Sequence, residues 1–197
     1  MSATFILASR GSLTLEHALR AISELRQGSD RAVAIVGGAL IEIALTEALK
    51  IHLHPNKKIT DELFRTTGAF GAFATKVHLG KLVGLYGAQA HKDLTIVKDI
   101  RNAFAHSLEV SDFSTQKIRD WANNLRLCER YTMDNENPPP RPVTIREGPI
   151  GQRDWWFSVT NRNAALSNPR ERYLITTQVF TYGLAVPSES AMPEPPF

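Results

Sequence analysis

Cysteine is the scarcest residue of this 197-residue chain, which has only Cys128. Disulfide frameworks need paired cysteines, and thiolate zinc or redox sites need a second sulfur, so a single cysteine excludes these classes. A free thiol is typical of a reducing compartment, and we therefore expect a cytoplasmic protein.

Histidine is also sparse and shows no clustered metal-ligand pattern. His52 and His54 are two residues apart, so on a helix they point about 200° apart and do not chelate together. Three further histidines are isolated in the sequence: His17, His78 and His91. The sequence therefore predicts no metal site and no cofactor.

Long uncharged apolar runs are missing too. No stretch of about 18 residues, the length needed to cross a bilayer, passes without a charge. The opening residues, MSATFILASRGS, contain no charged leader followed by a long apolar run. We therefore expect no membrane partner. The net charge of +3 permits an acidic partner but does not require one.

Phosphate-loop and covalent chemistry have no candidate residues. The stretch GAFGAF, residues 68–73, lacks the lysine and the Ser/Thr of a phosphate loop and follows no predicted strand. No serine or cysteine has a His/Asp arrangement that can be recognised from the sequence.

What the chain does contain is helical periodicity. Apolar residues recur at spacings of three and four from residue 12 to residue 128, and no segment before residue 140 alternates like a strand. We predict an all-α protein, an up-and-down helical bundle over 1–128. The expected helices follow Ser12, follow Ser29 or Asp30, and cover 58–64, about 72–84, 88–106 and a stretch capped by Ser114.

Two features of the predicted helices identify the expected core. Gly37 and Gly38 interrupt the most apolar helix at a cost of about 1 kcal/mol each relative to alanine, which indicates that another helix crosses closely there. Apolar stripes mark the buried faces of the next two main helices; their residues are Phe73, Val77, Leu79 and Leu82, then Leu94, Val97, Ile100 and Phe104.

The residue composition changes after Cys128. MDNENPPPRP reads as an exposed loop, and apolar residues resume towards a last helix from about residue 170. We expect 129–186 to form a loop and a C-terminal helical arm that Trp155, Trp156 and Phe157 lay on the bundle. The proline-rich tail 187–197 is expected to be loose.

DIRNAFAHS, residues 99–107, carries the candidate chemistry. A metal-free ribonuclease needs a group that moves protons near neutral pH and a fixed cation for the charge that develops on phosphorus. His106 suits the first task and Arg101 the second, with Asn102 beside it. On an ideal helix Arg101 and His106 lie about 140° apart, so they converge only if the helix ends or unwinds near His106.

RNAFAH resembles the Arg-x4-His signature, with a polar residue after the arginine, of HEPN domains. These are helical bundles, many of which are metal-independent endoribonucleases. The resemblance implies catalytic roles for Arg101, Asn102 and His106, single-stranded RNA as the substrate, and a homodimer.

A wider stretch resembles the mannitol-operon repressor (MltR) family. SDRAVAIVGGALIEIALTEALKIHL, ELF, FGAFATKVHLGKLVGLYG and KDLTIVKDIRNAFAHSLE match it in order and spacing over about 29–128. Matching positions to which we assign a structural or partner-facing role are Asp30, Arg31, Phe73, Lys76, Asp93 and Phe104. The family name implies repression of transcription, yet the chain has no convincing helix-turn-helix, basic arm or zinc finger.

Three interpretations of the motif therefore stay open. It is a ribonuclease site, a surface for a ligand or partner, or a polar seam in which Arg101 pairs with Asp30, Glu42 or Glu47 and in which Asn102 and His106 satisfy loop carbonyls. We favour a non-enzymatic cytoplasmic regulator that acts through protein contacts, with the ribonuclease as the alternative. An open basic cleft would indicate the enzyme, whereas Arg101 against a carboxylate would indicate the regulator or the seam.

Overall fold

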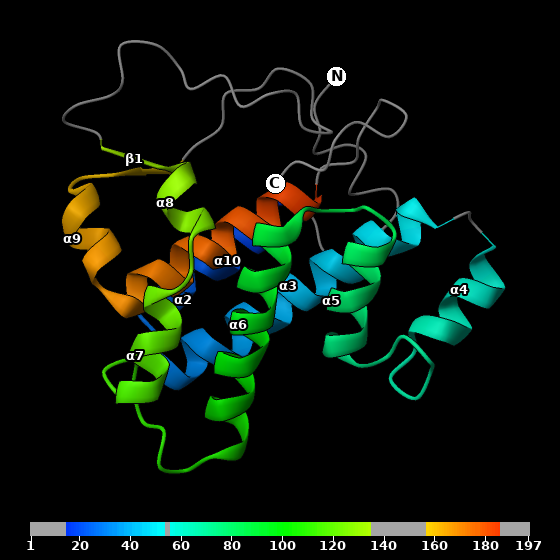
Figure 1. The fold of residues 1–197 in the computed structure, drawn as a ribbon, viewed down its shortest axis with the longest axis horizontal. Helices are drawn as coiled ribbons and strands as arrows, with labels where there is room; N and C mark the ends of the chain where they lie inside the picture. Colours follow the sequence, from blue (N-terminus) through cyan, green and yellow to red (C-terminus); the bar gives the residue numbers. More distant parts are fainter. Residues whose placement is uncertain (1–14, 54–55, 135–156, 186–197) are drawn as a thin grey trace.

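The computed structural model describes residues 15–53, 56–134 and 157–185. Over these residues the chain is a helical bundle with one small sheet, which confirms the predicted all-α class (Figure 1). The helices are α2 (Leu15–Leu25), α3 (Asp30–His52), α4 (Lys57–Phe64), α5 (Phe73–Leu82), α6 (Ala88–His106), α7 (Gln116–Asn123), α8 (Leu127–Tyr131), α9 (Arg162–Ser167) and α10 (Pro169–Ala185).

Helix α3 is the centre of the bundle. It begins where the Ser29 side chain accepts a hydrogen bond from the Ala32 amide at 3.2 Å, which confirms one of the two predicted caps. It then packs against α2, α5, α6 and α10. Among the described helices α3 alone is long and apolar enough to cross a membrane by length and composition. Contact with four helices accounts for that apolar character, since a helix in the middle of a bundle is apolar nearly all round.

Gly37 and Gly38 mark the closest helix crossings, as predicted. A Cβ on Gly37 would lie 3.1 Å from Cε1 of Tyr173, and a Cβ on Gly38 would lie 3.0 Å from Cβ of Arg101. Helix α10 therefore crosses α3 at the first glycine and α6 crosses it at the second. The two missing side chains allow α3 to contact both helices at adjacent positions.

Helix α10 belongs to the same core as the earlier helices. It lies along α3 and also contacts α2, α7, α8 and α9 (Figure 1). The Tyr173 hydroxyl donates to the Ala34 carbonyl of α3 at 2.8 Å, and Leu174, Val179 and Phe180 are fully buried. Residues far apart in the sequence thus complete a single hydrophobic core, in which the expected C-terminal arm is an integral helix.

The small sheet was not predicted. Strand β1 (Thr132–Asp134) pairs in parallel with β2 (Phe157–Val159), with Thr132 opposite Phe157. The expectation of no strand before residue 140 was wrong, because three residues are too few to show alternation. Trp155, Trp156 and the tail 187–197 lie outside the described residues.

Two other local expectations need correction. Leu82, predicted in the core, is 83% exposed because α5 ends there and the chain turns at Gly84, whose φ is +74°. Ser114 does not cap α7; Thr115 is the N-cap, and the Asp112 carboxylate accepts hydrogen bonds from both backbone amides, at 2.9 and 3.0 Å. One oxygen of this aspartate, Oδ1, accepts from both amides.

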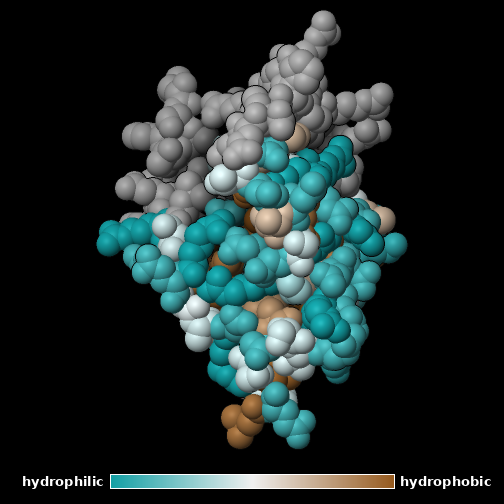
Figure 2. Space-filling model, turned by 90° about the vertical axis from the view of Figure 1, so that its left-hand side faces the viewer, coloured by the Kyte–Doolittle hydropathy of each residue, from teal (hydrophilic) through white to brown (hydrophobic). Residues whose placement is uncertain are grey.

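The end of the bundle formed by α7, α8 and α9 faces the viewer in Figure 2. Its surface is mostly hydrophilic, and the apolar residues on it form small separate areas. Over the described residues, this side therefore shows no continuous apolar surface for a partner.

Candidate functional site

Arg101 lies at the crossing of α3, α5 and α6. Its aliphatic stem lies on Gly38, and its guanidinium group is 5.8 Å from the centre of the Phe73 ring. One guanidinium nitrogen is 3.4 Å from Oε2 of Glu42, and the Arg101 side chain remains 30% exposed. Of the three carboxylates considered from the sequence, Glu42 is the partner of Arg101. The ion pair is partly exposed to solvent.

Lys76 of α5 shares the same carboxylate. Its Nζ donates to Oε1 of Glu42 at 2.9 Å, and the Lys76 side chain is only 8% exposed. Two cations therefore contact one carboxylate, which leaves an excess of one positive charge. Within the described residues the Arg101 guanidinium donates no hydrogen bond, so the exposed cation retains donors for an external acceptor.

His106 is the last residue of α6 and does not approach Arg101 by unwinding. The Ser107 amide donates to the Ala103 carbonyl at 3.0 Å, so the helix stays regular through His106. The two side chains therefore leave α6 about 140° apart. His106 is exposed, Asn102 is half-buried, and neither makes a hydrogen bond among the residues described by the structure. The sequence-predicted trio is not assembled within one chain.

Asn102 and His106 were expected to satisfy loop carbonyls, but the carbonyls at the end of α6 and just after it accept hydrogen bonds from Arg31. Its guanidinium donates to the carbonyls of Phe104, Ser107 and Val110, the last two at 3.1 and 2.7 Å. A fork of donors at the start of α3 thus satisfies the orphan carbonyls at the end of α6. Phe104 itself is fully buried, with its ring centre 5.2 Å from that of Phe113.

Asp30 and Asp93 are also engaged with the backbone. Asp30 accepts from the Phe113 amide at 2.8 Å and pairs with Nε of Arg170 at 2.9 Å. Asp93 is fully buried, and its Oδ2 accepts from the amides of Arg126 and Leu127 at the start of α8, at 2.9 and 2.8 Å. Burial raises the pKa of Asp93, and these hydrogen bonds oppose the shift. Both carboxylates therefore have a structural role, because they connect segments that are distant in the sequence.

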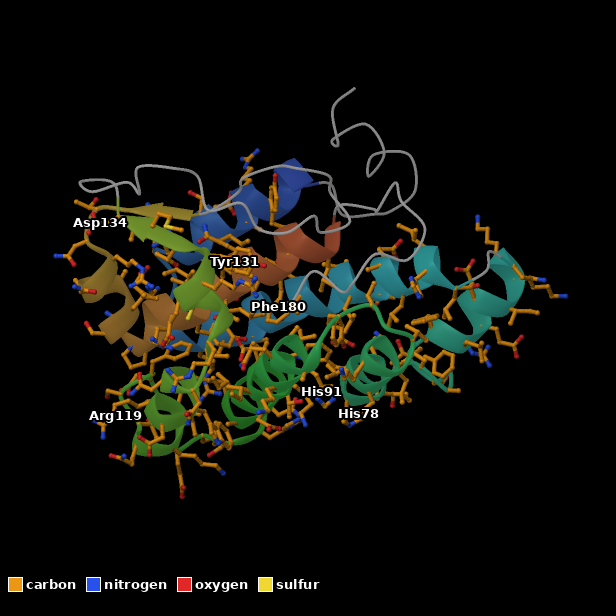
Figure 3. The ribbon with its side chains drawn as sticks, turned by 45° about the horizontal axis from the view of Figure 1, so that its top comes forward. His78, His91, Arg119, Tyr131, Asp134 and Phe180 are labelled. Atoms are coloured by element: carbon orange, nitrogen blue, oxygen red, sulfur yellow. The ribbon has the colours of Figure 1, made fainter. Side chains whose placement is uncertain are left out.

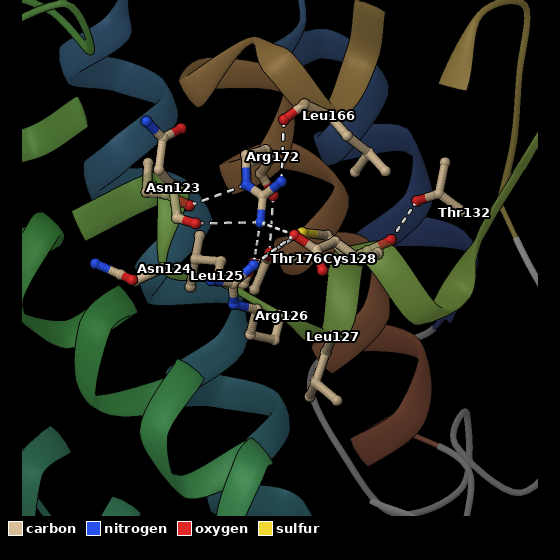
Figure 4. A network of polar contacts seen from close by, with 12 residues as sticks. Asn123, Asn124, Leu125, Arg126, Leu127, Cys128, Thr132, Leu166, Arg172 and Thr176 are labelled. Carbon is tan, nitrogen blue, oxygen red and sulfur yellow. Dashed lines mark hydrogen bonds and ion pairs between the residues drawn. The ribbon is translucent and has the colours of Figure 1, made fainter. Parts of the chain in front are cut away.

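Arg172 is the most heavily bonded side chain that sequence reasoning missed (Figure 4). It is 6% exposed and donates to Oε1 of Glu129 at 2.7 Å. It also donates to four backbone carbonyls around α7, α8 and α9, those of Ala122, Asn123, Leu125 and Leu166. Arg172 follows Arg170 and Glu171 at the start of α10, so no pattern in the sequence distinguished it.

Cys128 lies in the same neighbourhood and is fully buried in α8, as the sequence placed it on a helix. Its Sγ donates to the Leu125 carbonyl at 3.4 Å, and burial raises the pKa of the thiol. A buried thiol with a raised pKa is a poor nucleophile.

His78 and His91, expected to be isolated, lie side by side on α5 and α6 (Figure 3). Nδ1 of His78 is 3.1 Å from Nε2 of His91. Burial, then the charges of His78 and Lys81, lower the pKa of His91. Among the described residues no group of three or more histidine, cysteine or acidic side chains is placed to hold a metal ion.

Comparisons with family models, with curated proteins and with solved structures found no match to this chain.

Proposed function

We propose that this protein is a non-enzymatic cytoplasmic regulator that acts through protein contacts, as the resemblance to the mannitol-operon repressor family implies. The observation that carries the proposal is the state of Arg101. Its guanidinium is held beside Glu42 and Phe73, is 30% exposed, and donates no hydrogen bond to the described protein. A fixed, exposed cation with unused donors suits recognition of a carboxylate on another protein.

The placement of His106 favours a carboxylate partner over phosphate cleavage. His106 leaves α6 on another side and is not positioned to exchange a proton with a group bound at Arg101. Arg101, Lys76 and Glu42 together leave a single excess positive charge, which one partner carboxylate neutralises.

Helix α3 also exposes two large apolar side chains on a face separate from this cation. Val36 and Ile43 are 42% and 38% exposed. They are seven residues apart, so they share one face of the helix, about 140° to 160° around α3 from Gly38, on which Arg101 packs. We therefore assign a carboxylate of the partner to Arg101 and a second, apolar contact of the same partner to Val36 and Ile43.

The test is a binding experiment with matched variants. Full-length protein captures partners from a lysate in parallel with Arg101→Glu, Ile43→Asp and the control Arg119→Glu, an exposed arginine on α7 (Figure 3). We expect at least one partner that the parent and the control retain and that both test variants lose. Titration calorimetry with that purified partner should reproduce the loss. Partners bound equally by all four proteins would contradict the proposal.

The second candidate is a HEPN-type metal-independent endoribonuclease. It is favoured by the exposure of His106, whose ring makes no hydrogen bond among the described residues, and by the unused donors of Arg101. Because the two side chains diverge within one chain, this function needs a second copy to complete the site. Sedimentation equilibrium tests it: a homodimer is required, and a monomer mass at all concentrations would exclude it.

A further inference from the structure

The His78–His91 pair carries an independent inference. The two rings come from α5 and α6, two helices that pack directly on each other, and their centres are 5.3 Å apart (Figure 3). The facing nitrogens are 3.1 Å apart. Two imidazole nitrogens bound to one tetrahedral zinc ion at 2.0–2.1 Å are separated by about 3.3 Å. The helices thus already hold both nitrogens at nearly the spacing of a shared ion.

We propose that His78 and His91 form a two-histidine site for a divalent transition ion of the zinc class, which links α5 to α6. His78 is exposed and His91 is half-buried, so water can supply the remaining ligands and the His78 ring has room to turn. Such an ion prefers imidazole nitrogen, and binding rises towards Cu²⁺ in the divalent series.

Binding replaces the hydrogen bond between the rings. In the present pair one ring donates its N–H to the other. Coordination needs a lone pair on both facing nitrogens, so the donor ring moves its proton to its outer nitrogen, and both rings bind as neutral imidazoles. Lys81, whose charge reaches His91, opposes the ion because both are positive.

The experiment titrates Zn²⁺ into the full-length, tag-free protein by calorimetry, with Cu²⁺ electron paramagnetic resonance as a second readout. We expect one saturable ion per chain and nitrogen couplings from two imidazoles. His78→Gln and His91→Gln should each weaken binding by at least tenfold. His106→Gln, which removes a lone exposed histidine from α6, should leave the affinity unchanged.

A variant that binds Zn²⁺ more tightly distinguishes a lost binding site from a misfolded protein. Lys81→Ala removes the opposing charge from an exposed position and should tighten Zn²⁺ binding several-fold. The proposal fails if the parent shows no saturable Zn²⁺ binding. It also fails if both histidine variants bind Zn²⁺ as tightly as the parent.

Discussion

Arg172 and Arg101 each lie beside a glutamate in the same helical core, but they are bonded very differently. The Arg172 side chain is 7% exposed and donates to four backbone carbonyls as well as to Glu129. The Arg101 side chain is 30% exposed, and its ion pair with Glu42 is 3.4 Å long. An arginine whose N–H groups all donate within the protein holds segments of the chain together. An arginine that is held in place but has N–H groups without an acceptor can bind a group on another molecule.

The largest effect should come from emptying the Arg172 site. Arg172→Ala removes a charged donor from the carbonyls of Ala122 and Leu125 and the less exposed of the two arginines that bind Glu129. Because each hydrogen bond to a charged group contributes about 1.5 to 3 kcal/mol, the loss of these bonds should cost about 3 to 5 kcal/mol. Urea unfolding at pH 7 measures the loss. A loss under about 1 kcal/mol would show that this arginine does not hold the segments together.

The next effect tests the close crossing of α3 and α10 at Gly37. Gly37→Leu forces a side chain against Tyr173 and Thr177, and such overpacking should destabilise the fold by about 1 to 3 kcal/mol. Val36→Leu, on the exposed face one residue earlier, is the matched control and should be nearly neutral. Equal stability of the two variants, measured by thermal unfolding, would argue against close crossing of α10.

Arg101→Ala should change stability little. Its pair with Glu42 is part-exposed and screened by water, and Lys76 continues to neutralise that carboxylate at 2.9 Å. We expect a loss of about 1 kcal/mol or less in urea unfolding. A loss as large as that of Arg172→Ala would make Arg101 a second structural arginine and remove the contrast between the two sites.

The smallest effect is a pH dependence at the Arg172 site. Burial alone would raise the pKa of Glu129, but the hydrogen bond and charge of Arg172, with Arg126, lower it overall. Because the folded-state pKa is depressed, this carboxylate contributes stability above its unfolded value of about 4.3, and that contribution disappears as the pH falls through the folded-state pKa. From pH 6 to pH 3, the urea midpoint should fall further for the parent than for Glu129→Gln. Parallel curves would show no linkage.

The sequence was informative where a residue's neighbours lie within its own helix. The apolar stripe of α6, the Ser29 cap and the glycine crossings all follow from spacing along one segment, and each is seen in the fold. Leu82 is exposed although it belongs to the apolar stripe of α5, because it lies at the end of the helix and the chain turns at Gly84.

Contacts between distant segments were the part that spacing did not reveal. Arg31 binds carbonyls more than 70 residues away, and Arg172 binds the α7–α8 connection from the last helix. The His78–His91 pair likewise depends on the packing of α5 against α6. Glu42 was one of three equivalent carboxylates in the sequence, because only the crossing of α3 and α6 selects it as the partner of Arg101.

The most direct test of the central claim, that the Arg101 motif serves contact and not catalysis, is RNA cleavage. Purified full-length protein is incubated with labelled single-stranded RNA and a chelator, beside Arg101→Ala and His106→Ala. We predict that the RNA stays intact with all three proteins. Cleavage by the parent that is lost in both variants, while their unfolding free energies stay within about 1 kcal/mol of the parent, would contradict the account and establish a ribonuclease.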